Sequence, residues 1–352
     1  MTSKTRYFMG GSAAILVAGL GTGLVAYYGG GFPSLSASRS GPSELSYVPA
    51  DAAVVAFANV REVMDSQLRQ RLKQVMPPET GQKEFEQDTG IDIERDIQYV
   101  VAAMTSPGTG GLPNNANGLV IARGSFNTTE LETLAREHGG VVEEYKGKRL
   151  VKASNVRVEA DAPAVLPQVD VHKSVHAAVI LAFLEPGLVA IGSEAAIRSA
   201  IDTKLSPHSI TSNNEMMELI ADIDQGNNVW AVGRFDAIAN QARLPAEIAG
   251  KLPAIKTFAV MTHIDGGVSG SLRAETRDEA SAENLRQVVQ GLLALGKMQS
   301  DPKATALLNS LELSPGTGKT VKLSFAVPSE VLDMIPMNKG MPKPPTPPTP
   351  ER

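Results

Sequence analysis

Residues Ser314–Thr320 read Ser-Pro-Gly-Thr-Gly-Lys-Thr, which resembles the phosphate-binding loop of an ATPase. That loop follows the pattern G-x-x-x-x-G-K-[ST] and lies between a buried strand and a helix, whose first N–H groups hold the phosphates. Here the first glycine position is Leu313, a helical pattern over Ala304–Glu312 precedes the string, and Val321–Val327 alternates like a strand. Because the order of elements is inverted, the string predicts a turn that enters a strand and not an ATP site.

Two other spacings suggest metal ligands. His172 and His176 are four residues apart, which chelates zinc on a helix, but Lys173 stands where zinc peptidases carry glutamate. The stretch also runs into a strand-like sequence, on which the two imidazoles would lie about 13 Å apart. Asp88–Asp96 is spaced like a calcium loop, yet the glycine and closing glutamate positions of an EF-hand do not fit. We predict no metal site from either.

Catalytic signatures are missing from the sequence. It contains no Gly-x-Ser-x-Gly motif, and it contains no cysteine, which excludes disulfides, thiolate metal sites and a cysteine nucleophile. His263 lies two residues from Asp265 in a predicted hairpin, where a cross-strand polar contact is the simpler interpretation. We therefore predict no catalytic residue, no cofactor and no enzyme. A hydrolase with an unrecognised carboxylate pair stays a third alternative.

Composition limits the class of protein and its partners. The chain has 352 residues, of which 42% are hydrophobic and 20% charged, and its formal net charge is −5. These fractions are typical of a folded protein. No cluster of five or more Lys and Arg residues occurs, so a nucleic-acid surface is not expected.

A membrane anchor is predicted near the N-terminus. Residues 1–6 carry Lys4 and Arg6 and form a cytoplasmic head, and Tyr7–Tyr28 contains no Asp, Glu, Lys, Arg or His. As a helix that segment spans the hydrocarbon layer of roughly 30 Å, with tyrosines near both interfaces. Positive charge on the short head favours a cytoplasmic N-terminus, which puts the rest of the chain outside the inner membrane, in the periplasm of a bacterium.

Two further interpretations concern the same segment. A cleaved signal peptide is the competing one, with a weak site at Ser34–Ser36, although the apolar run is longer than such peptides have. Gly19 and Gly23 form a GxxxG spacing inside the predicted span, which lets two helices approach closely. We expect these glycines to be a helix-dimerisation contact, so a homodimer is open.

A linker and a folded body follow the anchor. Residues 29–45 are rich in Gly, Ser and Pro and predict a flexible tether. The next segments alternate between strand and helix patterns, with capping residues at Asn59, Asn127 and Ser193 and turns at Lys146-Gly147 and Glu185–Gly187. They predict a first α+β domain over residues 46–210.

The second part of the body repeats this order. It contains a strand before Asp236, a helix that Asp236 caps, a hairpin that turns at Asp265–Gly267, a long helix over Thr276–Gly296 and a final strand and helix. We predict a second α+β domain over residues 211–336, so that two similar split β-α-β halves, each an antiparallel sheet with helices, follow the transmembrane helix. An internal duplication explains the repeated order.

A proline-rich tail closes the chain. Residues 337–352 include Pro342, Pro345 and Pro348 and predict an extended polyproline II segment. The PxxP spacing could dock an aromatic groove, but outside the cytoplasm a stiff spacer is the simpler role.

The segment YVPADAAVVAFANVREVMDS, with TGIDIERDI and AIGSEAAIRSAID later, resembles an uncharacterised group of membrane-anchored bacterial proteins. Their domains open on a Pro-Ala-Asp turn and a hydrophobic strand, and the resemblance covers residues 46–205. In the second half Gly226-Asn-Asn replaces Pro-Ala-Asp. The resemblance implies the anchored, duplicated architecture and no chemistry.

These patterns favour a single-pass, extracytoplasmic interaction or scaffold protein with protein partners. The alternative is a binder of a small apolar ligand or lipid, in a cleft between the two halves near residues 105–117.

Overall fold

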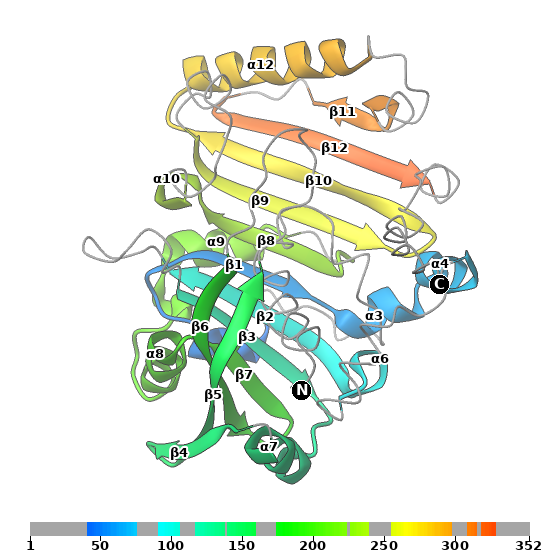
Figure 1. Cartoon of the computed structure of the whole chain (residues 1–352). Coiled ribbons are helices and arrows are strands. Elements are labelled where there is room, and N and C mark those ends of the chain that lie inside the picture. Colours follow the sequence, from blue (N-terminus) through cyan, green and yellow to red (C-terminus); the bar gives the residue numbers. More distant parts are fainter. Residues whose placement is uncertain are drawn as a thin grey trace, which may run out of the picture.

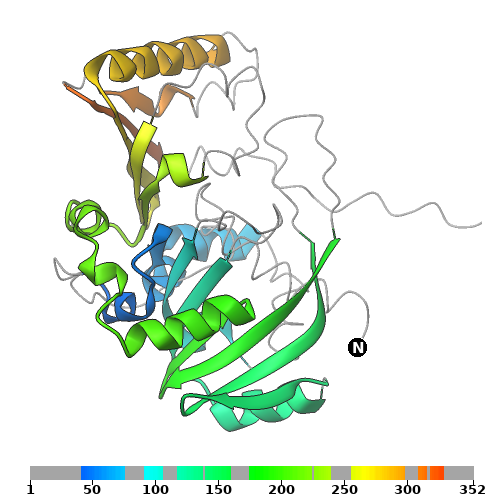
Figure 2. The same ribbon diagram turned by 90° about the vertical axis from the view of Figure 1, so that its left-hand side faces the viewer.

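The computed structural model describes residues 41–75, 91–105, 117–137, 139–159, 174–223, 226–238, 255–297, 308–314 and 318–328. The fold is mixed α+β: one twelve-stranded antiparallel sheet carries helices on both faces (Figures 1 and 2). The strand order across this sheet is β11-β12-β10-β9-β8-β1-β2-β3-β7-β6-β5-β4.

The strands follow one another mainly as hairpins. In chain order they are β1 (Ala52–Ala58), β2 (Ile97–Thr105), β3 (Asn117–Gly124), β4 (Val141–Tyr145), β5 (Lys148–Glu159), β6 (Ser174–Glu185), β7 (Leu188–Gly192), β8 (Val229–Arg234), β9 (Ile255–Ile264), β10 (Gly267–Thr276), β11 (Leu311–Leu313) and β12 (Thr320–Pro328).

The helices lie between strands or before the first one. They are η1 (Ser43–Tyr47), α3 (Val60–Asp65), α4 (Gln67–Val75), α6 (Ile93–Asp96), α7 (Thr128–Glu137), α8 (Glu194–Lys204), η2 (Ile210–Ser212), α9 (Asn214–Ala221), α10 (Phe235–Ile238) and α12 (Glu279–Lys297). The predicted caps are confirmed at Asn59, Asn127 and Ser193, whose side chains accept hydrogen bonds from backbone N–H groups three residues on.

The turn between β4 and β5 is the one predicted. Lys146 and Gly147 have φ values of 48° and 76°, as both central residues of a type I′ turn require, and this turn matches the twist of the strands that it joins. The hairpin of β9 and β10 turns at Asp265 and Gly266, also as expected.

Three local predictions are wrong. Helix α12 starts at Glu279, because Asp278 accepts the hydrogen bond from the N–H of Ser281 and caps the helix after Thr276 has ended β10. Helix α10 begins at Phe235, so Asp236 is its second residue and does not precede it. Leu311–Leu313 form a strand beside β12, so the predicted helix over Ala304–Glu312 does not extend to its last two residues.

The two faces of the sheet carry separate apolar clusters. We call the face with Val55, Val101 and Ile121 the η1 face, because η1, α8, η2 and α9 cover it. The opposite face, with Ala58, Val100 and Ala122, is the α3 face, and α3 and α7 pack on it. The alternation of side chains along each strand separates the two clusters.

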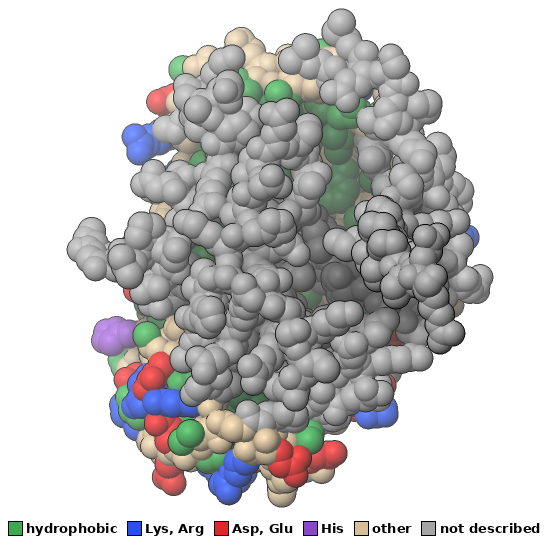
Figure 3. Space-filling view, in the orientation of Figure 1, with side chains coloured by type: hydrophobic (Ala, Val, Ile, Leu, Met, Phe, Trp, Pro, Cys, Tyr) green, Lys and Arg blue, Asp and Glu red, His purple; other side chains and the backbone are tan. Residues whose placement is uncertain are grey.

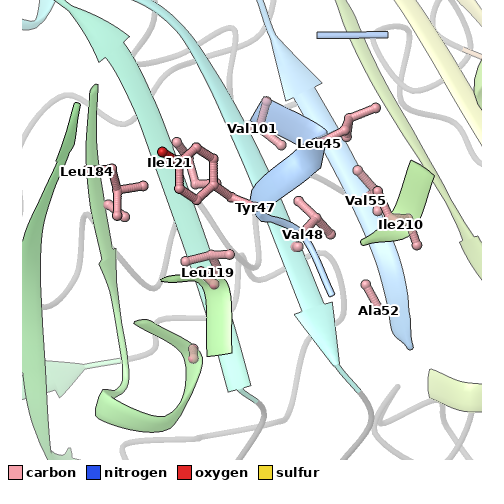
Figure 4. Close-up of a cluster of buried hydrophobic side chains, with 14 of the residues drawn as sticks. Leu45, Tyr47, Val48, Ala52, Val55, Val101, Leu119, Ile121, Leu184 and Ile210 are labelled. Atoms are coloured by element: carbon pink, nitrogen blue, oxygen red, sulfur yellow. The ribbon is translucent and has the colours of Figure 1, made fainter. Parts of the chain in front are cut away.

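The cluster on the η1 face is the larger core. Leu45, Tyr47 and Val48 lie over β1, β2 and β3, between Ile210 on one side and Leu184 on the other (Figure 4). All five of these side chains are almost completely buried. The short η1 helix is therefore held as a central piece of the core, although it precedes every strand in the chain.

One sheet runs through both of the predicted halves. Strands β1 and β8 pair in antiparallel orientation from Val54↔Gly233 to Ala58↔Val229. Phe57 on β1 stacks on Trp230 of β8, with ring centroids 5.6 Å apart. The centre of the sheet thus joins strands that are about 170 residues apart in the sequence.

The described residues contain no helix that is both long and apolar enough to cross a membrane. The predicted anchor Tyr7–Tyr28, most of the tether and the proline-rich tail lie outside the described residues.

Candidate functional site

A buried cluster of polar side chains fastens η1 to the sheet. Glu44 is only 1% exposed. Its Oε1 accepts a hydrogen bond of 2.9 Å from Nε of Arg123 and a second one from Nη2 of the same side chain. Its Oε2 accepts a hydrogen bond of 3.0 Å from the hydroxyl of Tyr99. The carboxylate is thus removed from water and bonded by three donors from β2 and β3.

The burial of this cluster changes the pKa of its members. Burial raises the pKa of the Tyr99 hydroxyl, and the negative charge of Glu44 raises it further. Burial alone would lower the pKa of Arg123, but the hydrogen bonds and charge of Glu44 outweigh it and raise that pKa. Both groups are therefore held in one protonation state at neutral pH, which suits a structural contact and not proton transfer.

A second group of contacts continues the cluster toward α8. The hydroxyl of Tyr47 donates a hydrogen bond of 2.7 Å to Oε1 of Glu185, at the turn between β6 and β7. The ammonium of Lys204 lies 4.6 Å from the centre of the Tyr47 ring and 3.7 Å from Glu185. It also donates a hydrogen bond of 3.0 Å to the hydroxyl of Ser46. Both ends of η1 are thus tied to elements that are far away in the sequence.

The apolar surface on the α3 face of β9, β10, β12 and β11 is the second feature. Leu272 lies opposite Val260 on one side and Leu323 on the other, and Leu313 lies beyond Leu323. Leu272 is 41% exposed, whereas Val260, Leu323 and Leu313 are half-buried. Figure 3 views the molecule from this side, and hydrophobic side chains are visible there in a hollow of the half that contains β9–β12.

Two phenyl rings extend this apolar surface. The ring of Phe325 lies over Gly270, and the ring of Phe258 lies over Gly233, so that a Cβ atom at either glycine would meet ring carbons at 2.8–2.9 Å. A β-strand glycine often marks such a close approach. The opposite side of the same strands is polar, since Ser271 pairs with Ser324 there and Arg273 with Lys322.

We call these six side chains the apolar platform: Phe258, Val260, Leu272, Leu313, Leu323 and Phe325. Helix α12 covers one end of the same face, where Ala282 and Leu285 pack on Ala274 and Val321. The platform continues the buried surface under α12 into a region where Leu272 is in contact with solvent.

A small pocket lies between α8 and the central strands β2 and β3. It has a volume of about 120 Å³ and is lined by Pro49, Asp51, Ala103, Thr105, Leu119, Ala195, Ala196 and Ser199. Ligand sites for drug-sized molecules generally occupy about 300–1,000 Å³. This pocket is therefore too small for a lipid or a cofactor.

The residues considered for chemistry are not brought together. His263 is exposed, and its Nδ1 lies 2.6 Å from the carbonyl oxygen of Gly226, so it makes a local contact with the backbone. His172 and the side chain of His176 lie outside the described residues, as do Gly19 and Gly23. Within the described ranges no three His, Asp or Glu side chains are placed to hold a metal ion.

The structure agrees with the interpretation of the ATPase-like string. Gly318 has a φ of 70°, and Thr320 is already the first residue of β12, where a phosphate-binding loop would begin its helix. The guanidinium of Arg286 on α12 donates hydrogen bonds to the carbonyls of Gly318 and Thr320. The described end of the string, Gly318–Thr320, therefore leads into a strand and is hydrogen-bonded to α12.

The sequence alone predicted neither the buried cluster around Glu44 nor the apolar platform. The composition of residues 29–45 predicts a tether that includes Ser43–Leu45, but these three residues form the start of η1 in the folded body. The sequence signal for the buried cluster was slight: one Glu-Leu-x-Tyr stretch directly after a Gly/Pro/Ser-rich segment. The signal for the platform was clearer, because apolar residues alternate with polar or small ones along Val321–Val327 and along the neighbouring strands.

Comparisons with known proteins add a likeness in shape. No protein-family model and no curated protein matches the chain. A crystal structure of TP0453 (crystal form I) is similar over 85% of this chain and 96% of that chain, with 11% sequence identity and a TM-score of 0.43. This likeness is too distant to carry a function from that protein to this chain.

Proposed function

We propose that this chain is a single-pass, membrane-anchored interaction protein, whose folded body is held outside the inner membrane by its N-terminal segment. The observation that supports it most is the fastening of η1. The residues that directly follow the predicted tether are buried in the main core, and Glu44 is bonded to Arg123 and Tyr99.

This arrangement suits a body that is held by its N-terminus. Any pull on the tether acts first on η1, and releasing η1 would expose Leu45, Tyr47 and Val48 and leave the carboxylate of Glu44 without its donors. Exposing a fully buried leucine or valine costs about 1.5–3 kcal/mol each. The first residues of a domain are usually loosely held unless they are tied down, and Leu45, Tyr47 and Val48 are almost completely buried.

The proposed body has two similar halves. The order strand, helix, strand, strand, helix occurs as β8, α10, β9, β10, α12 and, with α4 and α6 following α3, as β1, α3, β2, β3, α7. The first strands of the two series pair with each other at the centre, and each is flanked by its own second strand. This symmetric order supports an internal duplication, with the pairing of β4 and β5 as an addition to the first half.

The second candidate function is the binding of an apolar ligand or lipid. The apolar platform favours it, because Leu272 is exposed among half-buried neighbours that include two phenylalanines. The residues 105–117, near which sequence analysis placed such a site, are for the most part outside the described residues. Binding to the platform and binding of a protein partner are compatible with the same anchored body.

Membrane extraction tests the anchor directly. The full chain is expected to stay in the membrane pellet after washing with alkaline carbonate, and a variant with Leu16→Arg and Leu20→Arg is expected in the supernatant. Each arginine in the middle of a span costs about 2.5–3.5 kcal/mol on the insertion scale. The body of the variant should unfold at the same temperature as that of the wild type. Extraction of the wild-type chain by carbonate would contradict the proposal.

The mass of the purified full-length product separates the anchor from its competitor. An uncleaved chain keeps Met1 or Thr2 at its N-terminus, whereas a cleaved signal peptide leaves a chain that begins after Ser34–Ser36. A product of the shorter mass would make the protein soluble after processing and would remove the basis for tethering.

A further inference from the structure

Helix α12 packs on the same face of the sheet as the apolar platform, and Leu313 of the platform belongs to the cluster under this helix. Leu285 of α12 is buried against the sheet, and Val289 packs beside it. Leu292 follows seven residues after Leu285 on the same side of the helix but is 49% exposed. Leu292 thus presents an apolar side chain to solvent on the helix that packs beside the platform.

The strands that carry the platform are apolar on one face and polar on the other. Along β10 and β12 the two faces differ in kind: leucine and phenylalanine project on the α3 face, and serine, arginine and lysine on the η1 face. An antiparallel sheet with one solvated face buries its other face against a partner. Among the described residues, α12 packs on this face at Ala274 and Val321, and of the platform side chains Leu313 belongs to its cluster.

The length of the tether limits what that partner can be. Fourteen residues, 29–42, separate the predicted span from η1. A flexible chain of that length has a root-mean-square extension of about 20 Å and reaches roughly 50 Å at most. The body, if anchored as proposed, cannot leave the immediate neighbourhood of the bilayer, so lipid is the most concentrated apolar material within its reach.

We infer that the apolar platform, together with Leu292 of α12, binds acyl chains of lipids from the membrane to which the body is tethered. This inference rests on the proposed anchoring and adds a ligand class to it. The two phenyl rings over Gly233 and Gly270 offer flat contact surfaces, and the leucines between them fill the space along the strands. The contact is apolar throughout and needs no charged headgroup site.

A photo-crosslinking experiment on the full chain tests the inference. The protein is incorporated into vesicles of phosphatidylcholine and phosphatidylglycerol that contain a phospholipid with a diazirine in its acyl chain, and crosslinked peptides are identified by mass spectrometry. Lipid is expected on the peptides of β10, β12 and α12 as well as on the anchor. The variants Leu272→Gln and Leu292→Gln should lower the crosslinking of the body by about tenfold together, the factor that corresponds to a loss of about 1.4 kcal/mol.

Leu205→Gln provides the matched control. Leu205 is 67% exposed at the end of α8, on the η1 side of the sheet, so its replacement should leave the crosslinking of the body unchanged. All three leucines are exposed, and the variants are therefore expected to fold; the fluorescence of Trp230, the single tryptophan, verifies this.

The outcomes separate the two proposals. Crosslinks on the anchor alone would overturn the inference about the platform and leave the anchoring intact. Crosslinks on neither segment would overturn the anchoring itself. Crosslinks on the body that persist in the Leu272 and Leu292 variants would also overturn the inference, because they would place the lipid elsewhere.

Discussion

Arg123 donates two hydrogen bonds from one guanidinium to a single carboxylate oxygen of Glu44, although the two residues are 79 positions apart. This contact joins the first helix of the body to a strand in the middle of the sheet. Each charge compensates the other, so removal of one partner leaves the other buried without an opposite charge.

Removing the arginine is expected to destabilise the protein strongly. Arg123→Met leaves the buried carboxylate of Glu44 without its cation, and losing one partner of a buried ion pair costs about 3–5 kcal/mol. Arg136→Met is the control: Arg136 is 60% exposed and pairs with Glu132 along a helix, so its loss should cost less than about 0.5 kcal/mol. Urea unfolding followed by the fluorescence of Trp230 measures both. Equal losses of unfolding free energy in the two variants would show that the buried ion pair contributes no more to stability than the exposed one.

The hydrogen bond from Tyr47 to Glu185 predicts a pH-dependent effect. This bond lowers the pKa of Glu185 below its ordinary value, with the charges of Lys204 and Arg123 acting in the same direction. A lowered pKa in the folded state contributes stability that is present at neutral pH and is lost as the pH falls through that folded-state value.

Tyr47→Phe should therefore destabilise the protein at pH 7 and much less at pH 3. The measurement is the free energy of unfolding of both proteins at several pH values. A difference between wild type and variant that stays constant from pH 7 to pH 3 would mean that Glu185 does not accept this hydrogen bond as a carboxylate.

Two glycines should respond to alanine in opposite directions. At Gly270 a Cβ atom would lie 2.0 Å from the carbonyl oxygen of Met261 and 2.8 Å from the Phe325 ring, so Gly270→Ala must displace the strand or the ring. Overpacking of this kind typically costs 1–3 kcal/mol. Gly291 lies in α12 with nothing within 4 Å of its Cβ position, and Gly291→Ala should stabilise by up to about 1 kcal/mol. Thermal unfolding tests this: the midpoint should fall below that of the wild type for Gly270→Ala and rise above it for Gly291→Ala.

Asn228 links β9 to the residue that caps helix α3. Its side chain donates to the carbonyl of Ile264 at 2.8 Å and accepts from the N–H of the same residue at 3.0 Å. Its backbone carbonyl accepts from the N–H of Asn59.

Asn228→Ala removes both side-chain bonds of a buried residue, and each buried group left without a partner costs about 1–3 kcal/mol. Asn214→Ala, at an exposed position in the first turn of α9, should change the stability by less than about 0.5 kcal/mol. Chemical denaturation of the two variants tests this, and a loss at Asn214 as large as that at Asn228 would contradict it.

The parts of the fold that could be predicted are those set by neighbouring residues. The turn at Lys146-Gly147 and the caps at Asn59 and Ser193 depend on backbone conformations and hydrogen bonds within a few residues. The alternation in Val321–Val327 similarly indicated a strand and excluded an ATP site.

The parts that escaped prediction depend on distant residues. The pairing of β1 with β8 and the bond of Glu44 with Arg123 join segments that no local pattern connects. A glutamate in a Gly/Pro/Ser-rich context is typical of a solvated linker, and only the approach of β2 and β3 makes it a buried residue. Leu311 and Glu312 are predicted as helix because their strand pairing with β12 is likewise invisible in their own segment.

The most direct test of the account is the accessibility of the body to protease in intact spheroplasts. A chain with an epitope tag after Arg352 is treated with protease from outside, before and after lysis, with a cytoplasmic protein as the control for integrity. The account predicts that the tag is lost in intact spheroplasts while the control protein survives. A tag that is protected until lysis would place the body in the cytoplasm and contradict the proposed function.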